Sequence, residues 1–135
     1  MVTAGSARGA IMPVCETTID SRSGGATHAL AITIHDVARG FRGPEFASLR
    51  AQLTRSADSI AATIVEGCGA DTGKEFARFL VMSIKSASET ESHLLSARDR
   101  RALADTPWRQ LSGEAVAIRR MTYVYRERVL EDDED

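Results

Sequence analysis

The strongest constraint on the fold of this chain is the spacing of its apolar residues, which repeats at helical intervals from residue 28 almost to the end. In the first such segment Leu30, Ile34, Val37 and Phe41 advance by four, three and four positions, as one face of an α-helix requires. Glycine and proline residues then interrupt the pattern between helical segments. We predict four helices, over residues 27–39, 44–66, 72–103 and 107–129, packed as an antiparallel bundle.

The composition agrees with an all-α class. The chain has 135 residues, enough for one domain with a real core, and only 5% of them are aromatic. A low aromatic content with abundant Ala, Leu, Ile and Val suits packed helices better than sheets. No run approaches the ~20 apolar residues of a membrane span, and the start lacks a signal-peptide pattern. We therefore expect no membrane partner and a cytoplasmic location.

Three regions follow from the composition along the chain. Residues 1–26 are rich in Gly, Ser, Thr and Ala without periodicity, so we predict a flexible, disordered leader. Residues 27–130 form the four-helix bundle. Residues 131–135 are all acidic and are predicted to be a short solvated tail. Without that tail, the chain has 17 basic and 14 acidic side chains.

The ends of the helices carry recognisable signals. Gly67 is placed to close the second helix with a left-handed cap. Thr72 and Glu75 have the spacing of a capping box at the start of the third helix. Thr106 and Pro107 suit the cap and the first position of the fourth helix. The large core residues predicted from the periodicity are Phe46, Leu53, Ile60, Phe76, Leu80, Leu94, Leu111 and Ile118.

The second helix carries more than one distinctive face. Beside its apolar stripe runs a polar stripe of Gln52, Arg55, Ser59, Thr63 and Glu66, and a third face carries small residues that include Ala51 and Ala62. Such a helix is enclosed on several sides, which favours an oligomer. Alternatively, the alanines fill exposed positions because they favour helix. Arg55 and Glu66 point in nearly the same direction, which favours an interhelical or intersubunit ion-pair network over a catalytic pair.

Residues suited to catalysis or metal binding are few. The chain has no Glu-x-x-His pair of the kind that di-iron bundles use, and no nucleophile with a base in a recognisable context. We assign no catalytic residue, metal or cofactor, and we expect Cys15 and Cys68 to be buried or inert thiols. The arginines are a candidate nucleic-acid surface, but they equally suit a solvated face. They are Arg98, Arg100, Arg101, Arg119, Arg120 and Arg126.

Three short motifs carry a family resemblance. The motifs are residues 49–60, residues 64–67 and residues 75–80, and they contain Gly67, Glu75, Phe76 and Phe79. Together they resemble the bacterial four-helix bundle proteins linked to intervening sequences in 23S ribosomal RNA genes. Thr63 departs from the usual Asn of that pattern. The resemblance implies a homopentamer without enzymatic activity. The fold of this family is distantly similar to that of the accessory protein of diversity-generating retroelements, a pentamer that binds nucleic acid and a reverse transcriptase.

Two functional hypotheses follow. The first is a non-enzymatic homo-oligomeric assembly module, a pentamer by resemblance, whose partner is RNA or an RNA-handling protein. The second is a helical bundle that binds a small ligand or a metal through the polar stripe of the second helix. The lack of a second inward-facing set of His and carboxylate residues counts against the second hypothesis.

Overall fold

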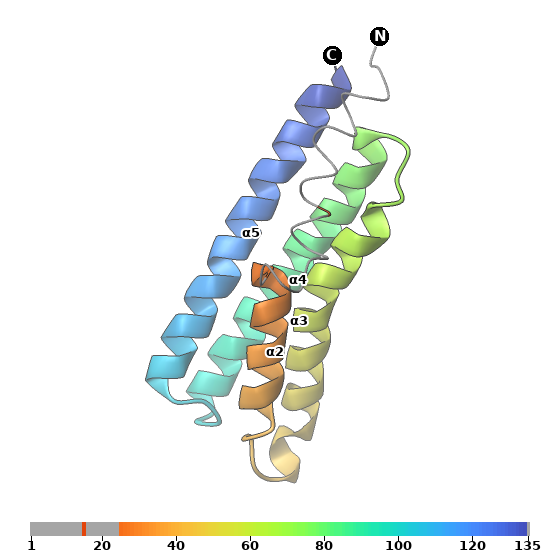
Figure 1. Ribbon diagram of the computed structural model, residues 1–135. Helices are drawn as coiled ribbons and strands as arrows, with labels where there is room; N and C mark the ends of the chain where they lie inside the picture. Colours follow the sequence, from red (N-terminus) through yellow and green to blue (C-terminus); the bar gives the residue numbers. More distant parts are fainter. Residues whose placement is uncertain (1–14, 16–24, 135) are drawn as a thin grey trace.

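The computed structural model of the protein describes residue 15 and residues 25–134. This part of the chain contains no strand, and its elements are α2 (Ala26–Ala38), the short 3-10 helix η1 (Pro44–Phe46), α3 (Ala47–Gly67), α4 (Gly73–Asp99) and α5 (Asp105–Glu134). The four α-helices run up and down as one bundle (Figure 1). The predicted all-α four-helix bundle is confirmed.

The first helix is much shorter than its neighbours. At ~1.5 Å per residue, the 13 residues of α2 extend ~20 Å, whereas the 30 residues of α5 extend ~45 Å. The core is accordingly divided in two. One cluster includes Leu30 and Ile34 from α2 packed with residues of the other three helices. The second lies toward the Gly67 end of α3 and contains no residue of α2.

Cys15 fills a place in this second cluster. Its side chain is 4% exposed and packs with Ile64, Phe76, Leu80 and Val129. It forms a disulfide with Cys68, with the two Cα atoms 5.9 Å apart. The expectation of two inert thiols is therefore wrong. The physical reason is that α2 leaves this end of the bundle open, and a distant part of the chain occupies the gap. The rest of the predicted leader, up to residue 24, lies outside the described residues.

The predicted core residues are buried, with one exception. Leu53, Ile60, Phe76, Leu80 and Leu94 have no exposed surface, and Leu111 and Ile118 are nearly as enclosed. Phe46 is only partly buried, because it lies in η1 at the end of the bundle. There it packs edge-on against Phe41, with ring centroids 6.4 Å apart.

The helix ends agree with the predictions in part. The hydroxyl of Thr72 accepts a hydrogen bond from the backbone N–H of Glu75 at 3.1 Å, as the capping signal predicted. The fourth helix begins at Asp105, two residues before the predicted start, because the N–H of Trp108 already donates to the carbonyl of Ala104. The third helix ends at Asp99 and not at residue 103.

Gly67 has a different role from the one predicted. It is the last residue of α3 and is followed by Cys68 in a right-handed conformation, so it is not a left-handed cap. Instead it lets α3 and α4 approach closely. A Cβ atom at this position would lie 2.7 Å from the Cβ of Phe79 and 3.3 Å from the ring of Phe76.

The acidic C-terminal residues continue the last helix. Helix α5 extends through Glu134. The carboxylate of Asp133 accepts hydrogen bonds from the backbone N–H groups of Gly73 at 3.1 Å and Lys74 at 3.2 Å. A carboxylate at this place satisfies free N–H groups and interacts favourably with the positive end of the helix dipole. The end of α5 thus caps the start of α4.

Candidate functional site

A seam of hydroxyl groups joins α3 to α4. The hydroxyls of Ser59 and Ser86 are 2.8 Å apart, and Thr90 donates to the hydroxyl of Ser56 at 3.0 Å. Ser83 donates to the backbone carbonyl of Ile60 at 2.7 Å. Small polar side chains at these positions let the two helices approach while every buried hydroxyl finds a partner. We call these residues the hydroxyl seam.

A polar groove opens above the hydroxyl seam. It has a volume of about 410 Å³ and is lined by Gln52, Arg55, Ser56, Ser59, Ser86, Glu89 and His93. The structure therefore brings three of the five residues of the predicted polar stripe to one place. Thr63 instead donates to the carbonyl of Ser59 at 2.8 Å, and Glu66 lies exposed.

The charged residues of the polar stripe do not pair within the chain. Among the described residues, neither Arg55 nor Glu66 has an oppositely charged group within 4.0 Å. Both residues are exposed. The interhelical form of the predicted ion-pair network is therefore wrong for the described part of a single chain. Helical periodicity places side chains on a face, but it does not set the distance between charges on neighbouring helices.

The alanine face of α3 points away from the core. Ala51 and Ala62 are both exposed, as are Asp58 and Val65. Asp58 is the partner of His35 on α2, with His35 Nε2 2.8 Å from its carboxylate. Val65 is 45% exposed and is one of seven large apolar side chains that are exposed in the described part of the chain. Apart from this contact with α2, the described part of the chain leaves the face uncovered.

The remaining motif residues serve the close contact between α3 and α4. Phe76 is fully buried, and Phe79 is half-buried where it covers Gly67. Glu75 accepts a hydrogen bond from the N–H of Asp71 at 3.3 Å and so stabilises the turn before α4. These four motif positions have a structural explanation that does not require a ligand.

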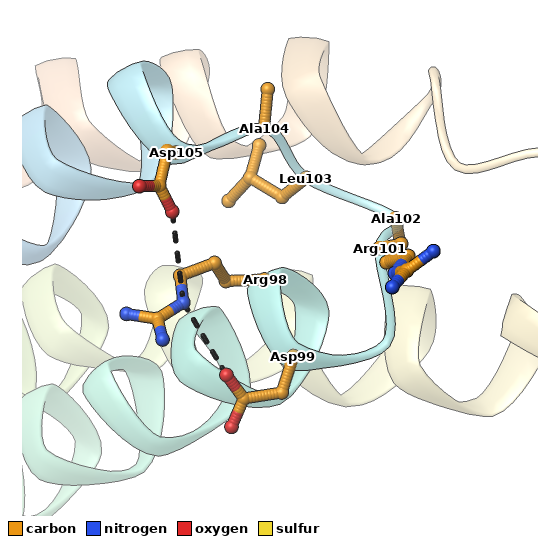
Figure 2. Close-up of a pocket in the computed structure, with 7 residues that line it drawn as sticks. All are labelled: Arg98, Asp99, Arg101, Ala102, Leu103, Ala104 and Asp105. Carbon is orange, nitrogen blue, oxygen red and sulfur yellow. Dashed lines mark ion pairs between the residues drawn. The ribbon is translucent and has the colours of Figure 1, made fainter.

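Arg98 and Arg101 near the end of α4 line a pocket with the connection to α5 (Figure 2). Arg98 lies 3.3 Å from the carboxylate of Asp99 and 3.7 Å from that of Asp105, and its guanidinium stacks over Trp108 at 4.4 Å. In Figure 2, Arg101 lies apart from this ion-pair cluster. Arg101 thus differs from Arg98, whose charge is already compensated.

The arginines of α5 lie elsewhere. Arg119 is 14 residues from the start of α5, or ~21 Å along its axis. Its guanidinium donates to Glu91 at 2.7 Å and 3.3 Å, and this hydrogen bond raises the pKa of Arg119. Arg126 donates to Glu127 at 2.8 Å, and Arg120 is exposed. The six predicted nucleic-acid residues therefore do not form one patch.

Sequence reasoning missed several residues at these places. Ser86, Glu89 and His93 join the polar groove from α4, and Arg50 contacts the loop before α3 by donating to the carbonyl of Phe41. The alternation of small hydroxyl residues with Glu89 and His93 along α4 is the available signal for the groove. The contact of Arg50 has no sequence signal, since it depends on how the loop turns.

Two features of the described residues bear on the class of protein. Among the described residues, no three His, Cys, Asp or Glu side chains are grouped so that they could hold a metal ion. None of the helices in this part of the chain combines the length and apolarity needed to cross a bilayer. The disulfide between Cys15 and Cys68 is a bond typical of oxidising compartments, so it counts against the expected cytoplasmic location.

The fold and the hydroxyl seam define a small all-α four-helix bundle in which α3 and α4 are joined by polar contacts. The sequence model of the 23S rRNA-intervening sequence protein family matches residues 25–124, and the chain belongs to this family. The match covers most of the bundle, from α2 to the middle of α5. The search of curated proteins and the search of solved structures each returned no match.

Proposed function

We propose that this protein is a non-enzymatic homo-oligomer, a pentamer by family resemblance, that acts as an assembly module and binds RNA or an RNA-handling protein. Membership of the 23S rRNA-intervening sequence protein family supports this proposal. The observation that carries the assembly part is the face of α3 that the described part of the chain leaves uncovered, where Ala51, Ala62 and Val65 are exposed. Arg55 and Glu66 lie beside them, and neither has an oppositely charged group within 4.0 Å among the described residues.

The physical argument for assembly rests on small and unpaired side chains. Alanine lets a neighbouring helix approach closely, and Val65 gains stabilisation when it leaves water. Arg55 and Glu66 would find partners on a second copy of the chain. In a symmetric ring each such contact repeats at every interface.

The assembly is tested by light scattering coupled to size exclusion at micromolar concentration. We expect a mass near 73 kDa, five times the 14.6 kDa of one chain. Ala51→Glu or Ala62→Glu should dissociate the oligomer while circular dichroism still reports helix, because an interface cannot accept an unpaired buried carboxylate. Ala117→Glu, at an exposed alanine of α5, is the matched control and should leave the mass unchanged.

A mass of 14.6 kDa for the unmodified protein would refute assembly. Dissociation by Ala117→Glu as complete as that by Ala62→Glu would refute the assignment to α3. RNA binding is tested separately by fluorescence anisotropy. An absence of binding at low salt would remove the RNA part of the proposal and leave assembly intact.

A further inference from the structure

Two loops far apart in sequence meet at one end of the bundle. The connection from α2 to α3 and the connection from α4 to α5 both lie at the bottom of Figure 1. They touch directly, since Arg100 donates to the backbone carbonyl of Glu45 at 3.0 Å and lies over the ring of Phe46 at 5.2 Å. We call this surface, formed by residues 39–50 and 98–109, the loop end of the bundle.

The loop end carries an excess of positive charge. It holds seven arginines but only three carboxylates. Two of those carboxylates, Asp99 and Asp105, pair with Arg98 or Arg109, and Asp36 at the end of α2 pairs with Arg39. Four arginines have no carboxylate within 4.0 Å in the described part of the chain. They are Arg42, Arg50, Arg100 and Arg101.

The contacts of these four arginines leave their charges available. Arg50 and Arg100 donate to the backbone carbonyls of Phe41 and Glu45, which orients the guanidinium groups without neutralising them. Arg42 and Arg101 are exposed. A guanidinium held in place by a neutral acceptor retains donors that match the oxygens of a phosphate.

The other end of the bundle has the opposite charge. Residues 66–78 and 126–134 contain eight carboxylates and four basic side chains. The bundle is therefore electrically polarised along its axis, although the whole chain has a formal charge of only -2. A polyanion approaching such a molecule is steered toward the loop end and away from the opposite end.

Arg101 has a strained backbone within this surface. Its φ is 64°, and it is the only residue other than glycine with positive φ in the described part of the chain. The N–H of Arg101 bonds to the carbonyl of Arg98 at 3.0 Å, and that of Ala102 bonds to the carbonyl of Ala97 at 2.8 Å. This pattern is the Schellman helix end, where glycine is the usual residue. Strained backbone positions cluster at functional sites, where the surrounding structure holds them in place.

We propose that the loop end is the surface through which the protein binds the phosphodiester backbone of RNA, with Arg42, Arg50, Arg100 and Arg101 as the phosphate contacts. The inference rests on the RNA part of the proposed function and names its site. Arg119, Arg120 and Arg126 are not part of this surface, because two of them are already paired and all three lie on α5 away from the loops.

The test measures anisotropy of a fluorescein-labelled, mixed-sequence single-stranded RNA of about 20 nucleotides with the full chain. Four phosphate contacts to a single strand give a slope of log K against log salt near −3, or about a 50-fold loss of affinity from 50 to 200 mM salt. Arg42→Gln with Arg101→Gln should reduce this loss to about 7-fold and weaken binding at 50 mM. The same measurement with single-stranded DNA of the same sequence shows whether the ribose contributes to the affinity.

The matched control removes two exposed arginines from the opposite end, as Arg78→Gln with Arg128→Gln. Both double variants change the net charge equally, so we expect only the loop-end variant to lose affinity. Equal losses in both would overturn the loop-end site while leaving RNA binding in place. No RNA binding by the unmodified protein at 50 mM salt would overturn both the site and the RNA part of the proposed function.

Arg101→Gly separates binding from folding. Glycine adopts positive φ without strain, so this variant should melt at a higher temperature than the unmodified protein. It also lacks the guanidinium, so its affinity for RNA should fall. A variant that is more stable and binds RNA unchanged would show that Arg101 is not a phosphate contact, and no loss of fold could explain that result.

Discussion

Replacing Gly67 and Gly113 separately by alanine should change the stability of the protein in opposite directions. Both residues lie in helices, Gly67 at the end of α3 and Gly113 within α5. On helix propensity alone, each Gly→Ala change would favour folding by up to ~1 kcal/mol. The two positions differ in what a new methyl group would meet.

At Gly67 the methyl group would collide with a part of α4 that cannot move alone. Its Cβ would lie 2.7 Å from the Cβ of Phe79 and 3.0 Å from its Cγ, where carbon atoms normally stay about 3.5–4.0 Å apart. The Cβ of Phe79 is fixed to the backbone, so α3 and α4 must separate. Overpacking of this kind costs ~1–3 kcal/mol, and after a propensity gain of at most ~1 kcal/mol we expect a net loss of up to about 2 kcal/mol.

At Gly113 the methyl group would meet nothing within 4 Å. The variant should therefore gain most of the propensity term, ~1 kcal/mol. Urea unfolding followed by circular dichroism measures both changes, with all proteins at one concentration because assembly would shift the midpoint. Gly67→Ala as stable as the unmodified protein would refute the close approach of α3 and α4. A loss at Gly113 would refute the exposure of that face.

Three further stability changes follow from the same structure. Asp133→Ala removes the acceptor for the N-terminal amides of α4 and should cost ~1 kcal/mol, whereas Asp132→Ala, which has no such contact, should cost little. Reducing the Cys15–Cys68 disulfide, which spans 53 residues, should lower the free energy of unfolding by up to about 4 kcal/mol, and thiol titration before reduction should find no free thiol. Ile60→Ala should cost ~2–5 kcal/mol in the same urea assay, and a loss under ~0.5 kcal/mol would contradict its burial.

The helices themselves were predictable because their signals are local. The spacing of Leu53, Ile60, Leu80 and Leu94 sets a buried face within each helix, and all four side chains are fully enclosed. The Thr72 cap is equally local, since it depends on residues three positions apart. Gly67 shows the limit of such reasoning. A glycine near a helix end suggests a left-handed cap, but here the glycine makes room for the close approach of Phe79 on another helix.

The candidate site was predictable only in part. The polar stripe placed Gln52, Arg55 and Ser59 on one face of α3, and the structure brings all three to the polar groove. The half of the groove contributed by α4 depends on the register between two helices. That register is set by the hydroxyl contacts and by the close approach at Gly67. No pattern within a single helix predicts these contacts, because they join two helices.

The class of fold, the number of helices and the residues that face the core could be predicted from the sequence, because they follow from the repeat of the helix along the chain. Which charges are compensated depends instead on the tertiary structure. Arg98 and Arg101 are three residues apart, yet Arg98 is paired with Asp105 across a turn, and Arg101 has no carboxylate within 4.0 Å among the described residues. Ion pairs depend on distances of a few ångströms between groups that are separated along the chain, and folding alone brings those groups together.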